Sequence, residues 1–197
     1  MRPRRLRIPG LVTILVATWV TNGCGGSLFR VRPAIELPPL SGEIKSASGG
    51  GILLKVAPFL EDEESQEIFE ANLPLSGVLP IRVELEYDTG TPTEVRQARF
   101  RLRDAEGREW KLLTTKQAIS LILKANGVFA YNPNSREQFA EEFGSYALDL
   151  STPLSPSNPR RQGFIFFGTP NRGPIEQPRG LRLQLERVPE PLEIIIN

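Results

Sequence analysis

Residues 163–168 read Gly-Phe-Ile-Phe-Phe-Gly, and this stretch decides the fold. Successive side chains of a β-strand point to opposite faces, so a strand that is apolar throughout leaves neither face suited to water. Such a strand is typical of the middle of a structure that is covered on both sides. We therefore expect its apolar residues to lie in the core, half of them under helices. The alternative is an exposed adhesive edge, which would need a partner to cover it.

Several other stretches alternate apolar and polar residues with a period of two. This alternation is typical of strands with one face in the core and one face in water. About seven short strands, with turn signals between most of them, predict a mainly β fold, which we interpret as an immunoglobulin-like antiparallel β-sandwich. The further strands are expected at residues 52–56, 81–87, 98–103, 110–112, 181–186 and 192–196.

One part of the chain breaks the β pattern. Residues 115–125 form a run suited to a helix, and Asn126-Gly127 after it is a typical helix stop. Phe139, Phe143 and Tyr146 then recur at intervals of four and three, the stripe of an amphipathic helix. These observations predict a helical pair, inserted between strands at about residues 115–150.

The composition narrows the classes of function. The 197-residue chain has no histidine, which removes the commonest general base and metal ligand, and its single cysteine cannot form an intramolecular disulfide. The net charge is +1, and much of the basic excess lies in the first seven residues. A mature chain close to neutral lacks the basic surface of a nucleic-acid-binding protein. We expect no metal, no cofactor and no nucleic-acid partner.

The N-terminus has the pattern of an export signal. Four arginines in residues 2–7 precede an uncharged, mostly apolar run at residues 11–20, about half of the roughly 20 residues that a membrane-spanning helix needs. Residues 20–25, Val-Thr-Asn-Gly-Cys-Gly, resemble the lipobox of bacterial lipoproteins, in which a small residue such as Gly23 precedes a cysteine, here Cys24. A plain secretory peptide with a free Cys24, or an uncleaved anchor, are the alternatives.

The lipobox resemblance implies a position in the cell. Signal peptidase II would cleave between Gly23 and Cys24, and the Cys24 thiol would carry a diacylglycerol whose two or more chains give stable anchoring. Gly25 in place of aspartate implies the outer membrane of the bacterial cell envelope. We therefore divide the chain into a signal peptide at 1–23, a lipidated N-terminus and flexible linker at 24–50, and a β-sandwich domain at 51–197.

Acidic residues gather in two places. The run at residues 61–64 is interpreted as a solvated turn, with a weak cation site as the alternative. Asp104, Glu106 and Glu109 flank a tight turn, where acids ordinarily face water. The alternative is a carboxylate pair for glycoside cleavage, which needs two such groups facing each other across a cleft.

Two sets of arginines are candidates for contact with a partner. Arg99, Arg101 and Arg103 share one face of a strand, which we interpret as a wet sheet face opposite Glu84 and Glu86, with an anion-binding face as the alternative.

The second set lies in a long loop rich in proline and glycine. Arg172 and Arg179 belong to this loop, at residues 169–180, and loops carry binding functions disproportionately often. We interpret the loop as a simple crossover between strands, and the alternative is that it is a contact surface for a partner.

These observations favour a binding or structural module over an enzyme. Residues 67–73 and 77–81 resemble bacterial lipoproteins that carry no assigned activity. We expect a membrane-tethered envelope lipoprotein with a protein or glycan partner. One alternative is a subunit of an envelope or secretion assembly, by fold-level similarity to lipoproteins of type VI secretion complexes. The other is a carboxylate-dependent envelope hydrolase.

Overall fold

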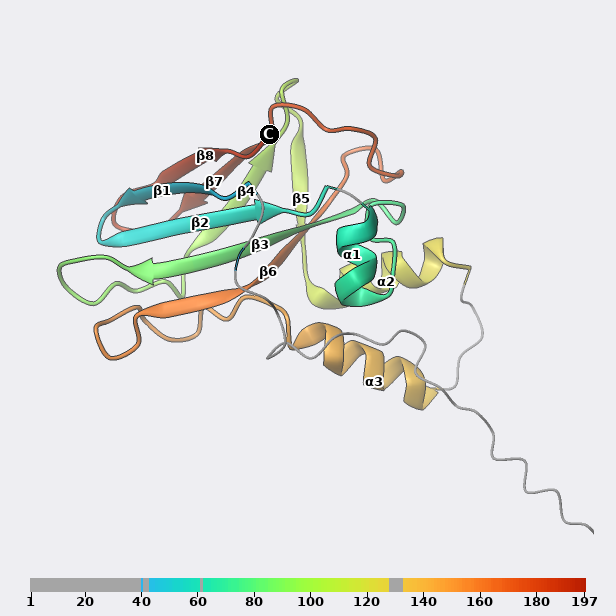
Figure 1. The fold of residues 1–197 in the computed structure, drawn as a ribbon, viewed down its shortest axis with the longest axis horizontal. Helices are drawn as coiled ribbons and strands as arrows, with labels where there is room; N and C mark the ends of the chain where they lie inside the picture. Colours follow the sequence, from blue (N-terminus) through green and yellow to red (C-terminus); the bar gives the residue numbers. More distant parts are fainter. Residues whose placement is uncertain (1–39, 41–42, 61, 128–132) are drawn as a thin grey trace, which may run out of the picture.

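The computed structural model describes residues 40, 43–60, 62–127 and 133–197 (Figure 1). Gly23 and Cys24 lie outside the described residues, as does most of the expected linker. The fold is mainly β, as predicted. The elements are β1 (Lys45–Gly49), β2 (Ile52–Pro58), α1 (Asp62–Phe69), β3 (Val78–Tyr87), β4 (Arg99–Arg103), β5 (Glu109–Leu113), α2 (Thr115–Ala125), α3 (Pro133–Gly144), β6 (Arg160–Gly168), β7 (Arg182–Glu186) and β8 (Leu192–Ile195).

These strands form one antiparallel sheet in the order β1-β2-β3-β6-β5-β4-β7-β8. The two edge strands approach each other, because the Gly50 amide donates to Glu190 Oε2 at 3.0 Å and a Cβ on Gly49 would lie 2.9 Å from Leu192. The sheet therefore curls until it is nearly a barrel. An immunoglobulin-like sandwich is not confirmed, since that fold has two separate sheets and these strands are hydrogen-bonded into one.

Strand β5 joins the two halves of the sheet because it changes partner along its length. Its residues Glu109 and Trp110 pair with β4, and Lys111–Leu113 pair with β6. Trp110 belongs to the core inside the curled sheet, whereas Leu113 belongs to the core on the outside. The strand thus turns a corner within five residues.

The described residues form two hydrophobic cores, one on each face of β6. Ile165 and Phe167 point into the curled sheet, where side chains from all eight described strands except β1 are buried together. Phe164 and Phe166 belong to the other core and are packed with buried residues of α1, α2 and α3. The prediction for residues 163–168 is confirmed: all four apolar side chains are buried, and half of them lie under helices.

Two segments have a different secondary structure from the one that the sequence analysis expects. Asp62–Glu64 of the acidic run are exposed, as expected, but they lie in the first turn of α1, where the helix dipole favours anions, and not in a loop turn. Ile68 and Phe69 at the other end of the helix are buried. The sheet begins with β1 at Lys45, inside the segment assigned to the linker. Gly50 and Gly51 have φ of 56° and 78°, which makes them a hairpin turn rather than linker residues.

The helical pair lies in the segment predicted for it. Phe139 and Phe143 of α3 are fully buried, and Tyr146 just beyond the helix is 2% exposed. The next residues run along β6 so closely that a Cβ on Gly163 would lie 2.6 Å from Leu148 Cα, so this position requires glycine. Within the described part of the chain, no helix is both long enough and apolar enough to cross a membrane.

We predict that Phe143→Ala destabilises the protein by about 3–5 kcal/mol, because it leaves a cavity among packed rings. The Phe143 ring stacks on Phe166 at a centroid distance of 4.8 Å and lies 5.1 Å from Phe69. Urea unfolding followed by circular dichroism measures the change. Lys116→Ala, at an exposed position of α2, is the control and should stay within about 0.5 kcal/mol of wild type. Equal stabilities for the two variants would contradict the packing described above.

Candidate functional site

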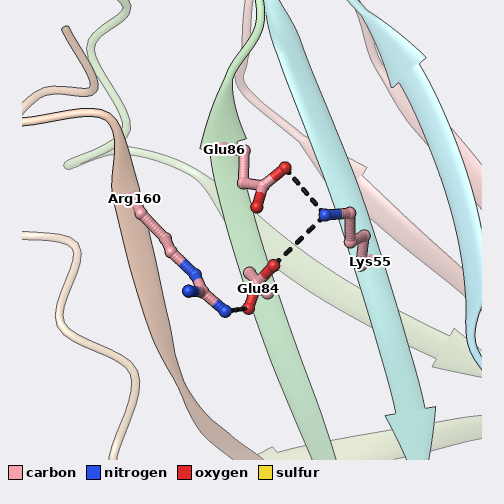
Figure 2. A network of polar contacts seen from close by, with 4 residues as sticks. All are labelled: Lys55, Glu84, Glu86 and Arg160. Carbon is pink, nitrogen blue, oxygen red and sulfur yellow. Dashed lines mark hydrogen bonds and ion pairs between the residues drawn. The ribbon is translucent and has the colours of Figure 1, made fainter. Parts of the chain in front are cut away.

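A network of charges centred on the buried Glu84 joins three neighbouring strands (Figure 2). Glu84 of β3 has a side chain only 3% exposed, and it accepts hydrogen bonds from Arg160 of β6 and from Lys55 Nζ of β2, the latter at 3.3 Å. Lys55 also binds Glu86 at 2.8 Å. The sequence analysis placed Glu84 on a wet face opposite the arginines of β4. That prediction is wrong, because β3 lies between β2 and β6 and these strands supply the partners.

The network keeps Glu84 ionised. Burial raises the pKa of the Glu84 carboxyl, but hydrogen bonding with Arg160, Glu86 and Lys55, together with the charge of Arg160, outweighs it, and the pKa lies below its ordinary value. Arg82, two residues earlier on the same strand, is 4% exposed, and burial lowers its pKa. A carboxylate that is held ionised by cations is unsuited to act as a general acid. We therefore assign the network to the stability of the sheet.

The arginine stripe of β4 lies on the outside of the sheet. Arg99 and Arg103 are exposed, as the wet-face interpretation expects. Arg101 forms ion pairs with Glu186 of β7 at 3.4 Å and with Glu109 of β5 at 3.6 Å. These glutamates replace the predicted partners because β4 lies between β5 and β7.

The acids of the 104–109 turn are engaged with neighbouring groups. Asp104 is buried and accepts hydrogen bonds from the backbone N and the Nε of Arg108, both at 2.8 Å, and from Trp110 Nε1 at 3.4 Å. Burial raises the pKa of Asp104, but these hydrogen bonds hold it below its ordinary value. Glu106 pairs with Arg108 at 3.1 Å. Asp104 thus orders the turn and is not the solvent-facing acid that the sequence suggested.

In the part of the chain that the structure describes, the loop at residues 169–180 borders two hollows. The smaller, with a volume of about 320 Å³, lies between this loop and the 104–110 hairpin, and Arg179 lines it. The larger, of about 760 Å³, is lined by Arg172. The structure therefore places the two predicted loop arginines at different hollows, and the β4 arginines line neither.

The larger hollow, which we name the α2 groove, is the candidate site. Four segments enclose it: the turn at residues 75–77, β5, α2, and the loop at residues 168–174. Sequence reasoning identified Arg172 and missed the other side chains, because they come from distant segments that no local pattern connects. The apolar lining includes Leu75, Leu113 and Leu121, and the cationic groups are Lys111, Lys124 and Arg172.

The loop that forms one wall of the α2 groove is held in place by hydrogen bonds. The Thr169 amide donates to the Gly77 carbonyl at 3.0 Å, and the Thr169 hydroxyl donates to the Gly173 carbonyl at 2.8 Å. Gly77 has a φ of 70°, and a Cβ there would lie 2.5 Å from the Gly173 oxygen. Because the backbones are in such close contact, the wall is preformed. Among the described residues, no group of three acidic or cysteine side chains is arranged to hold a metal ion.

We predict that Glu84→Gln destabilises the protein by about 1–3 kcal/mol at neutral pH, because the neutral amide loses the charge-assisted hydrogen bonds that the buried carboxylate accepts from Arg160 and Lys55. The folded-state pKa of Glu84 lies below the unfolded value of about 4.3. The contribution of ionised Glu84 to the free energy of unfolding is therefore complete above the unfolded-state pKa. It is lost as the pH falls through the folded-state pKa. Urea unfolding at neutral and acidic pH should show the gap between wild type and variant closing on acidification. Glu94→Gln, at an exposed position, is the control, and a gap independent of pH would refute the assignment.

The chain was compared with protein families, curated proteins and solved structures. No protein family matches the chain, and neither the curated proteins nor the solved structures contain a significant match.

Proposed function

We propose that the protein is a lipid-tethered module of the bacterial cell envelope that binds a partner protein and does not catalyse a reaction. In this proposal, lipid on Cys24 holds the protein at the outer membrane, and the β domain presents the α2 groove. The α2 groove is the observation that carries the binding role, because it combines an apolar lining, three cations and a wall fixed by hydrogen bonds. Preformed apolar pockets with a few polar groups are typical of binding sites.

The geometry favours binding over the hydrolase alternative. Carboxylate-dependent glycoside cleavage needs an acid with a raised pKa facing a second carboxylate. Asp104 and Glu84 have lowered pKa values instead, and both have their oxygens engaged by cations. A protein partner also agrees with membership of an envelope assembly, where the α2 groove would receive another subunit.

The lipid anchor is tested by changing the one cysteine. We predict that Cys24→Ala leaves the thermal melt of the domain unchanged and moves the protein from the membrane pellet to the soluble fraction, because the acyl chains have no other attachment site. Membrane fractionation after a high-salt wash, with immunoblotting, measures the change.

Ser27→Ala, three residues further along the same segment, is the matched control and should remain in the pellet. A Cys24→Ala variant that still pelleted after the salt wash would contradict the anchor. Mass spectrometry of the wild-type protein gives an independent check, because an unmodified chain starting at Met1 would also contradict it.

A further inference from the structure

We propose that the α2 groove binds an acidic, amphipathic peptide segment of the partner protein. This inference rests on the proposed binding role and names the chemistry of what is bound. Three observations support it: uncompensated positive charge around the groove, exposed apolar surface within it, and the distribution of the cations over separate elements.

The charge of the α2 groove is positive and is not neutralised from within. Lys111, Lys124 and Arg172 are exposed, and none of them has an ion-pair partner among the described residues. Glu109 is the one carboxylate in the described lining, and its Oε1 lies 3.6 Å from Arg101, outside the groove. A hollow lined by charge of one sign attracts and orients a ligand of the opposite sign.

The apolar lining of the α2 groove indicates that the ligand carries apolar groups as well as negative charge. Leu75 is 52% exposed on the wall of the α2 groove, although it is a large hydrophobic residue. Leu121 is partly buried, and Leu113 is a buried member of the core under the helices. Covering exposed leucine surface contributes about 25 cal/mol per Å² of apolar area removed from water. A ligand with apolar side chains between its acids gains this contribution, and a purely ionic ligand does not.

The arrangement of the cations favours a peptide over a fatty acid. Lys111 belongs to β5, Lys124 to α2 and Arg172 to the loop, so the positive charges lie on three different walls. A fatty acid has one carboxylate at one end and cannot meet cations on separate walls. Acidic side chains spaced along a peptide can do so, and the volume of about 760 Å³ lies within the range of ligand sites.

The test uses the detergent-solubilised full-length protein and a fluorescein-labelled peptide in which glutamate and leucine alternate. We expect saturable binding by fluorescence anisotropy, weakened by salt because exposed charges are screened. Lys111→Glu, Lys124→Glu and Arg172→Glu should each raise the Kd by about fivefold or more, and all three together by more than about a hundredfold. Lys116→Glu is the matched control, because it reverses an exposed charge on α2 outside the groove and should leave the Kd unchanged.

Three comparison ligands distinguish the acidic peptide from the other classes of ligand. A peptide of alternating glutamine and leucine tests the charge, sodium laurate tests the fatty acid, and a chitin oligosaccharide tests the glycan. Binding of laurate or of the oligosaccharide without the acidic peptide would overturn the inference, as would an equal loss of affinity in Lys116→Glu. Binding of laurate or of the oligosaccharide in the α2 groove would reject the peptide chemistry and keep a binding role, whereas the absence of binding by every ligand would reject both. The Cys24→Ala experiment tests the lipid anchor independently of either outcome.

Discussion

Strand β6 is apolar on both faces, and the need to hide both faces from water organises the rest of the molecule. Fully burying one phenylalanine or isoleucine side chain contributes about 1.5–3 kcal/mol, so neither face is dispensable for a protein of marginal stability. The curled sheet covers Ile165 and Phe167, while the helices cover Phe164 and Phe166. The two cores are therefore consequences of one short stretch of sequence.

The same constraint explains what could be predicted from the sequence. The apolar run at residues 163–168 and the stripe of Phe139 and Phe143 are local patterns, and the structure buries both as expected. Whether strands form one sheet or two depends on pairings between distant residues, which local alternation does not encode. Strand β3 has polar residues at alternate positions, a pattern that predicts one face in contact with water. Arg82 and Glu84 on that face are nevertheless buried.

Glu84 shows why such a residue is tolerated there. An ionised carboxylate out of water is costly unless cations accompany it. The register brings Lys55 directly opposite Glu84 on β2, and Arg160 lies on the other side on β6 (Figure 2). Both cations keep part of their side chains exposed, so only the carboxylate is buried deeply. The network thus lets β3 bury the Glu84 carboxylate without leaving that charge unpaired.

The candidate site follows from the same architecture through β5. Because this strand leaves β4 for β6 partway along its length, Trp110 stays inside the sheet while Lys111 and Leu113 line the α2 groove on its outer side. Helix α2 begins two residues after β5 ends, so it forms the opposite wall. The loop at residues 168–174 continues directly from β6 and completes the enclosure. The change of partner within β5 therefore both closes the sheet and forms one wall of the α2 groove. As a result, Trp110, which packs in the core, is adjacent in sequence to Lys111, which would contact a ligand.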